Sequence, residues 1–277
     1  MYKAVAPGAI GHGLNFKDAA EGAAKAGFEG YWFGPEGDWN VPASETKELL
    51  LKTHLKAAGF GLPVQFRQDA AAFEADLANL GKYARYAAEI GALRCATWIL
   101  PRSDTLTFSE NYELHRSRLK KVCEIFNEYG ITLGLEFVGP LTARKGAKYT
   151  FIHNLDQMLN LCADIGTGNC GLLLDVWHWD MAGQAFSDFE KFGNNQVALA
   201  HINDAPAGIP PDEQVDTVRR LPGETGVLRI AEFFGGLKKI GYDGPVLAEP
   251  FVPALAEMSY DNALKIVMDS FNRVWPE

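Results

Sequence analysis

The chain has 277 residues, of which 47% are hydrophobic and 22% charged, and its formal net charge is −9. This composition is typical of a folded globular protein, and the acidic balance without basic clusters disfavours nucleic acid and anionic membranes as partners. No apolar run approaches the ~18 residues of a membrane span, the first residues make a poor signal peptide, and the four scattered cysteines form no disulfide framework or CxxC zinc site. We therefore expect a cytoplasmic protein with reduced thiols.

Helical stretches that end in glycine, each followed by a β-rich run, recur along the chain. The first four intervals between these glycines are 32, 32, 39 and 36 residues. A glycine after a helix supplies its left-handed C-terminal cap, and a strand–helix unit repeated at this pitch predicts parallel strands with helical crossovers. The repeated glycines are Gly27, Gly59, Gly91, Gly130, Gly166 and Gly241.

Eight short apolar runs are predicted strands, and most are apolar throughout, as strands buried on both faces are. With amphipathic helices between them, they predict an α/β fold, a (β/α)8 TIM barrel that forms a single domain over residues 1–277. The alternative is an open doubly wound sheet, but residues 7–13 lack the GxGxxG loop of that fold. The predicted strands are 4–10, 30–34, 62–66, 93–100, 131–137, 171–176, 197–202 and 245–251.

Each of the last four predicted strands carries an ionisable residue at the end of its apolar run. In such barrels the catalytic residues gather at the carboxyl ends of the strands, and a buried charge there is costly unless it is paired or bound to a metal. Three carboxylates and one imidazole suit one divalent ion, Mn²⁺ first and Mg²⁺, Co²⁺ or Zn²⁺ as alternatives. The competing interpretation is four independent polar residues that cap strands or pair with Lys and Arg. The four residues are Glu136, Asp175, His201 and Glu249.

Motifs in the second half of the chain carry a resemblance to a known family. They are LEF at 135–137, LLLDVWH at 172–178, HINDA at 201–205, RRLPGETGVLRI at 219–230 and GYDGPVLAEPF at 241–251. Through them the whole chain resembles the xylose-isomerase-like TIM-barrel superfamily of sugar isomerases and epimerases. That superfamily includes ketose 3-epimerases, hydroxypyruvate isomerases, and inosose isomerases and dehydratases.

The resemblance implies that the four strand-end residues are metal ligands and that His178 contacts the substrate. It also matches Arg219 to the substrate-binding Arg of an RxxPGxG-like stretch, although this chain has PGETG where many relatives have PGxG. It further implies a homo-oligomer, a dimer or a tetramer.

Four residues from the first half are further candidates for substrate contact. His12 follows the first predicted strand, where it either contacts substrate or is an ordinary loop residue. Aromatic rings near the ends of the next three strands either stack on a sugar face or close the core. These three are Trp32, Phe66 and Trp98.

The predicted function is a metal-dependent sugar isomerase or epimerase acting on a small sugar or cyclitol. A divalent ion that chelates two neighbouring oxygens of a hydroxyketone stabilises the enediolate formed by proton loss, and Glu136 and Glu249 then serve as base and acid. Loss of a β-hydroxyl from the same intermediate makes a lyase of keto-sugars or keto-inositols the main alternative. More remote alternatives are a non-catalytic sugar-binding barrel and an endonuclease of the abasic-site type, whose additional His and Asp ligands this chain lacks.

Overall fold

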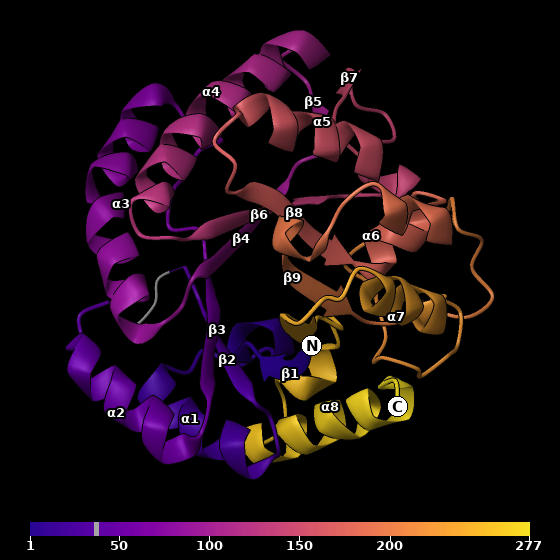
Figure 1. Ribbon diagram of the computed structural model, residues 1–277. Helices are drawn as coiled ribbons and strands as arrows, with labels where there is room; N and C mark the ends of the chain where they lie inside the picture. The colour runs from indigo at the N-terminus through magenta and orange to yellow at the C-terminus, as the bar shows by residue number, and fades with distance from the viewer. Residues whose placement is uncertain (36–38) are drawn as a thin grey trace.

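Residues 1–35 and 39–277 are described by the structure, which is a computed structural model. Eight parallel strands close into a barrel (Figure 1), which confirms the predicted (β/α)8 fold. The strands follow one another around the barrel in chain order, and β1 closes onto β10. They are β1 (Tyr2–Val5), β2 (Gly30–Phe33), β3 (Lys56–Gly61), β4 (Arg94–Ile99), β6 (Thr132–Phe137), β8 (Cys170–Asp175), β9 (Val197–Ile202) and β10 (Pro245–Ala248).

Helices surround the barrel on its outside (Figure 1). A short antiparallel ribbon, β5 (Arg102–Ser103) with β7 (Tyr149–Thr150), lies apart from the barrel. None of the described helices combines the length and the apolar character that crossing a membrane requires. The helices are α1 (Phe16–Lys25), α2 (Ala43–Thr53), α3 (Ala70–Ile90), α4 (Phe108–Asn127), α5 (Leu155–Ile165), α6 (Val176–Met181), α7 (Ile230–Lys239) and α8 (Tyr260–Val274).

Two buried clusters of apolar side chains hold the fold together. The larger one joins strands to helices, as where Phe60 of β3 meets Phe126 of α4 with ring centroids 5.9 Å apart. The smaller one is built from strand residues alone and fills the barrel interior with one large ring, that of Trp32, among small and aliphatic side chains. Because the interior is filled, a ligand can reach the strand ends only from the mouth of the barrel. This inner cluster contains Ala4, Trp32, Ala58, Ala96, Leu173, Leu199 and Leu247.

The glycine pattern and the helix starts are largely confirmed. Gly91 and Gly166 follow α3 and α5 with φ of 83° and 73°, in the left-handed region that a helix cap requires. At the other helix ends, the side chain of Asn15 accepts the Asp18 N–H at 3.0 Å, and that of Asn154 accepts the Gln157 N–H at 3.0 Å.

The prediction for the third strand was wrong. The strand is Lys56–Gly61, residues 62–66 form the loop after it, and α2 ends at Thr53 with His54 as its left-handed cap. Gly59 lies inside β3 in register with Trp32, and a Cβ at this position would collide with the Trp32 ring. The glycine is therefore required by close packing inside the barrel, which a sequence pattern does not distinguish from a helix cap.

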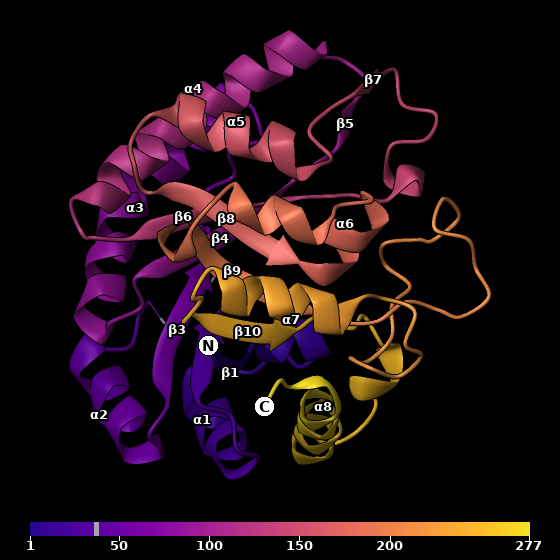
Figure 2. The same ribbon diagram turned by 45° about the vertical axis from the view of Figure 1, so that its right-hand side comes forward.

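Two other predicted strands are shorter than expected. β1 ends at Val5, and residues Pro7–Ile10 form a 3₁₀ helix, because proline has no N–H for the strand ladder but suits the first turn of a helix. β10 ends at Ala248, so Glu249 follows the strand directly. Figure 2 shows the long segments after β6 (138–154) and after β9 (203–229) projecting on the same side of the barrel.

Candidate metal centre

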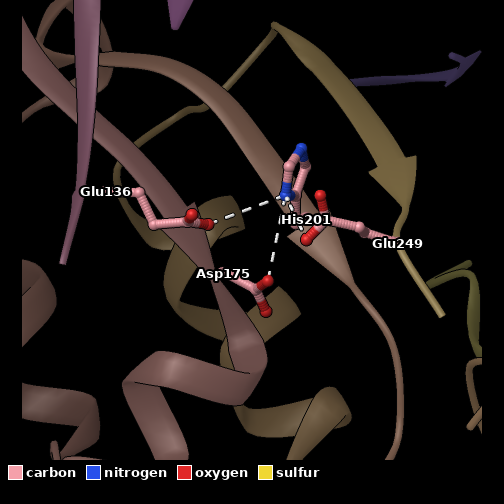
Figure 3. Close-up of side chains that lie close together, drawn as sticks. All are labelled: Glu136, Asp175, His201 and Glu249. Carbon is pink, nitrogen blue, oxygen red and sulfur yellow. Dashed lines mark ion pairs between the residues drawn. The ribbon is translucent and has the colours of Figure 1, made fainter. Parts of the chain in front are cut away.

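The four strand-end residues converge at the mouth of the barrel (Figure 3). One ligand atom from each of Glu136, Asp175, His201 and Glu249 lies within 4.8 Å of the others. Nδ1 of His201 lies 3.7 Å from Oε1 of Glu136, 3.8 Å from Oδ2 of Asp175 and 3.5 Å from Oε2 of Glu249. Parallel pairing produces this convergence, because Asp175 of β8 and His201 of β9 are register partners.

The donor set fits a divalent cation. Oε1 of Glu136 and Nδ1 of His201 are buried and have no hydrogen-bond partner among the described residues. Buried polar atoms are rarely left unpaired in native proteins, so two of them that face each other point to a missing ligand. Three carboxylates with one imidazole form a mainly oxygen site, as Mn²⁺, Mg²⁺ or Zn²⁺ accepts.

Asp175 is held in place by three neighbours, of which only Arg219 was a predicted site residue. Its Oδ1 accepts the N–H of Trp177 at 2.7 Å and the side-chain amide of Asn203 at 3.0 Å. Its Oδ2 accepts Nη1 of Arg219 at 2.7 Å. Burial raises the pKa of Asp175, but Arg219 and the two nearby histidines outweigh it and hold that pKa at about 2. Asp175 is thus a permanently ionised group, as a metal ligand must be.

Arg219 lies behind the ligand carboxylates. Its side chain is buried, and Nη1 lies 3.0 Å from Oε2 of Glu249 in addition to the contact with Asp175. Nη2 donates to Asp216 Oδ1 at 2.7 Å, and the guanidinium stacks on Phe251 at 4.6 Å. Sequence analysis missed Asp216, which shows no motif beyond its place three residues before Arg219. The structure therefore brings Arg219 to the cluster as a buried counter-ion of Asp175 and Glu249.

The two glutamates of the cluster have pKa values shifted in opposite directions. Burial, together with the charges of Asp175 and Glu249, raises the pKa of Glu136 well above its usual range. Burial also raises that of Glu249, but His201 and Arg219 outweigh it and the net pKa is lowered. Two carboxyls in one site with diverging proton affinities are a common arrangement in acid–base active sites.

His178 lies in the same buried network, as the resemblance implied. Its Nδ1 lies 3.3 Å from the backbone N–H of Gly139, and its Nε2 lies 3.2 Å from Nη2 of Arg219. Nε2 lies 3.7 Å from Oδ1 of Asp216 and 3.9 Å from Oε2 of Glu136. Burial lowers the pKa of His178, which favours the neutral ring. Gly139 has to be glycine, since a Cβ there would collide with the carbonyl of His178.

A cavity of about 700 Å³ connects the metal cluster with the loops of the first strands. Glu136, His201 and Glu249 line one part of it, and the predicted aromatic residues line another. Trp32 lies at the base and Trp98 is 43% exposed, while Phe66 lines the cavity from the loop after β3. Sequence analysis missed a further lining residue, Arg67, whose neighbours in space are distant in sequence. The aromatic lining residues are Trp32, Trp39, Phe66, Tyr83 and Trp98.

His12 does not line this cavity. Its Nε2 lies 3.0 Å from the carbonyl oxygen of Leu255, and its ring centroid lies 5.2 Å from that of Tyr260. Both partners belong to the segment that follows β10. The structure therefore gives His12 contacts with the C-terminal segment rather than with the other predicted site residues.

Comparison with known proteins places these features in context. A family model described as a xylose isomerase-like TIM barrel matches residues 20–270. An inosose isomerase of Halalkalibacterium halodurans is 29% identical over 155 residues, which are 55% of this chain and 51% of that protein. The chain thus spans about half the length of that relative. An L-ribulose 3-epimerase of Methylomonas sp. is 23% identical over 261 residues, 90% of this chain and 82% of that protein.

Solved structures have the same fold. A xylose isomerase domain protein from Alicyclobacillus acidocaldarius superposes with a TM-score of 0.88 at 23% identity, covering 99% of this chain and 98% of the other. The IOLI protein, whose crystal structure is described with a binding zinc atom, superposes with a TM-score of 0.82 at 19% identity and the same coverage, 99% and 98%.

Proposed function

The chain belongs to the xylose isomerase-like TIM barrel family, and from this premise we propose that it is a divalent-metal-dependent isomerase or epimerase of a small sugar or cyclitol. The observation that carries the proposal is the four-ligand cluster with two unpaired buried atoms at one end of a 700 Å³ cavity. An inosose isomerase and an L-ribulose 3-epimerase among the relatives support this class of reaction.

Glu136, Asp175, His201 and Glu249 would hold the ion, with Mn²⁺ as the first choice and Mg²⁺, Co²⁺ or Zn²⁺ as alternatives. When bound, the ion supplies Lewis-acid charge beside the substrate carbonyl and thereby acidifies the neighbouring C–H. Asp175 and His201 act only as ligands. The zinc atom in the IOLI structure supports a divalent ion in this fold.

Glu136 and Glu249 transfer the proton. They lie on two sides of His201 (Figure 3), so a substrate carbon between them can lose a proton to one carboxylate and receive one from the other. Return to the opposite face of the same carbon inverts it and makes an epimer. Return to the neighbouring carbon makes the aldose–ketose isomer. His178, which lies beside Glu136 in the same network, contacts a substrate oxygen, and Arg219 keeps Asp175 and Glu249 ionised.

Two measurements test this proposal. Elemental analysis should find about one divalent ion per chain, and the Asp175→Ala variant should lose it. The metal-loaded chain should then incorporate solvent deuterium next to the carbonyl of ketoses or inososes. Product analysis of the same reactions separates the isomerase from the lyase, because only the lyase releases water. Absence of metal under every loading condition would overturn the proposal, and three zinc ions per chain would favour the endonuclease.

The predicted homo-oligomer is a separate part of the proposal. Light scattering of the purified chain should give the mass of a dimer or a tetramer rather than 30.4 kDa. A monomer that is fully active would contradict it.

A further inference from the structure

An arginine that the proposed reaction does not use lies in the wall of the cavity. Arg67 is in the loop between β3 and α3 and lines the same cavity as the metal cluster. Its guanidinium carbon lies 4.0 Å from the ring centroid of Trp98 and 5.0 Å from that of Phe66. Nη1 donates to the backbone carbonyl of Trp98 at 2.6 Å. Stacking and this hydrogen bond fix the guanidinium plane while the side chain stays exposed to the cavity.

One edge of this guanidinium has no protein partner in the part of the chain that the structure describes. Nη1 is occupied by the Trp98 carbonyl, whereas Nε and Nη2 make no hydrogen bond, and no described carboxylate lies within ion-pair distance. Asp76 lines the cavity too, but its Oδ2 accepts the backbone N–H of Gln65 at 2.8 Å. Burial lowers the pKa of Arg67 and no acidic neighbour counters it.

A purely structural role would be to hold the loop between β3 and α3, but another residue already does this. Arg118 of α4 donates from Nη1 to the carbonyl oxygens of Phe66 and Gln68, at 2.8 and 2.5 Å. The loop backbone is therefore anchored on both sides of residue 67 without Arg67. What the Arg67 side chain adds is a cation in the cavity lining, held by Trp98 and with Nε and Nη2 unpaired among the described residues.

We propose that Arg67 binds an anionic group of the substrate, so that the substrate is a hydroxycarbonyl compound that also carries a carboxylate or a phosphate. The inference rests on the proposed function, which puts the carbonyl end at the metal cluster. The Nε and Nη2 N–H groups match the two oxygens of a carboxylate or phosphate, and such charge-assisted bidentate pairs are strong. The cavity of about 700 Å³ has the size of a small-molecule site, and both Arg67 and three residues of the cluster line it.

Matched substrates test the proposal. The metal-loaded chain is given a neutral ketose, the corresponding ketouronate and the corresponding terminal phosphate ester, and deuterium exchange is followed for each. We expect one of the two anionic compounds to exceed the neutral ketose by about 10- to 100-fold in kcat/KM. Which of the two it is distinguishes carboxylate from phosphate.

Variants then assign the preference to Arg67. In Arg67→Gln the ratio of anionic to neutral kcat/KM should fall by about 10- to 100-fold, mainly through KM, and Arg67→Lys should retain part of it because the charge remains. Arg102→Gln is the matched control, since Arg102 is an exposed cation of the β5–β7 ribbon outside the cavity lining, and it should leave the ratio unchanged. A ratio that is unchanged in Arg67→Gln would overturn the inference while the isomerase or epimerase stands.

A binding measurement distinguishes failure of the proposed anion site from failure of the proposed isomerase or epimerase function. Tryptophan fluorescence of the metal-loaded chain is titrated with D-glycerate, inorganic phosphate and glycerol, none of which reacts. Binding of glycerate or phosphate that is lost in Arg67→Gln supports the anion site, even if no hydroxyketone undergoes exchange and the proposed function falls. Equal binding to both variants, or no preference over glycerol, would overturn the anion site.

Discussion

The two walls of the cavity differ in how their side chains are held. The polar wall, at the ends of β6, β9 and β10, is lined by Glu136, His201 and Glu249, and Arg219 fixes Glu249 from behind. The aromatic wall, built from β2 to β4 and the segments that follow them, carries most of the rings and the cation Arg67 stacked on Trp98, together with polar side chains such as Asp76. Ionised groups in fixed positions are what proton transfer requires, whereas rings and a single exposed cation are what selects a substrate. Under the proposed function, the comparison assigns the reaction to the polar wall and specificity to the aromatic wall.

The largest expected effect comes from the polar wall. Glu136→Gln and Glu249→Gln keep the size of each side chain but remove both a metal ligand charge and a proton-transfer group. We expect each to lower turnover by roughly a thousandfold or more. Steady-state exchange kinetics on the true substrate measure this. Glu257→Gln, the same change at an exposed position after β10, should leave turnover as it is.

A variant of Glu136 or Glu249 that keeps more than about a tenth of the wild-type rate would remove that residue from the proton-transfer role. The proton-transfer role would then not belong to the polar wall as proposed.

The second effect concerns a histidine beneath the aromatic wall. His115 of α4 is buried between Phe66 and Phe151, with ring centroids 5.6 and 4.9 Å away. Burial lowers its pKa from 6.5 to about 4. Between these values the unfolded chain binds more protons than the folded one, so stability falls as the pH drops from 6.5 to 4. The full loss is about 3 kcal/mol of the free energy of unfolding.

Urea unfolding at pH 7 and pH 4 measures this contribution. His115→Phe should lose about 3 kcal/mol less than the wild type over this interval, because phenylalanine has no group to protonate. His54→Asn is the control, as His54 is an exposed left-handed cap that asparagine tolerates. An equal loss in His115→Phe and the wild type would show that His115 is protonated in the folded chain.

The polar wall was largely predictable from the sequence, because each ligand ends its own apolar strand. Glu136 and Asp175 follow runs of leucine, and parallel pairing alone brings such ends together. Of the partners that orient them, Arg219 was predicted as a site residue, whereas others were not. Asn203 and Asp216 lie in the segment after β9, and only the folded path of that segment puts them against Asp175 and Arg219.

The aromatic wall was harder to predict, since its contacts join separate loops. Gly59 had the pattern of a helix cap and yet lies inside β3 opposite Trp32, which displaced the third strand by six residues. Phe66 was expected at a strand end and lies in the loop. Arg67 stacks on Trp98, 31 positions further along the chain, and no local pattern records that contact.

The third effect tests how far the polar wall depends on its supporting residues. Asp216→Asn removes the charge that fixes Nη2 of Arg219 and so loosens the guanidinium behind Asp175 and Glu249. Residues that orient metal ligands typically contribute 10- to 100-fold to affinity, and we expect about a tenfold weaker affinity for the metal. Calorimetric titration of the metal-free chain measures it. Asp212→Asn, on the same segment but exposed, should bind as the wild type does.

The smallest effect tests the aromatic wall by itself. Trp98→Phe keeps a ring but weakens the cation–π contact that holds Arg67 at 4.0 Å. Such contacts contribute about 0.5–1 kcal/mol at exposed sites, so KM should rise about two- to fivefold with kcat unchanged. Metal affinity should stay at the wild-type value, because the substitution keeps an aromatic ring and leaves the backbone pairing of Trp98 with Glu136 in place. A fall in kcat or in metal affinity would show that the two walls act as one unit, coupled through the pairing of Trp98 in β4 with Glu136 in β6.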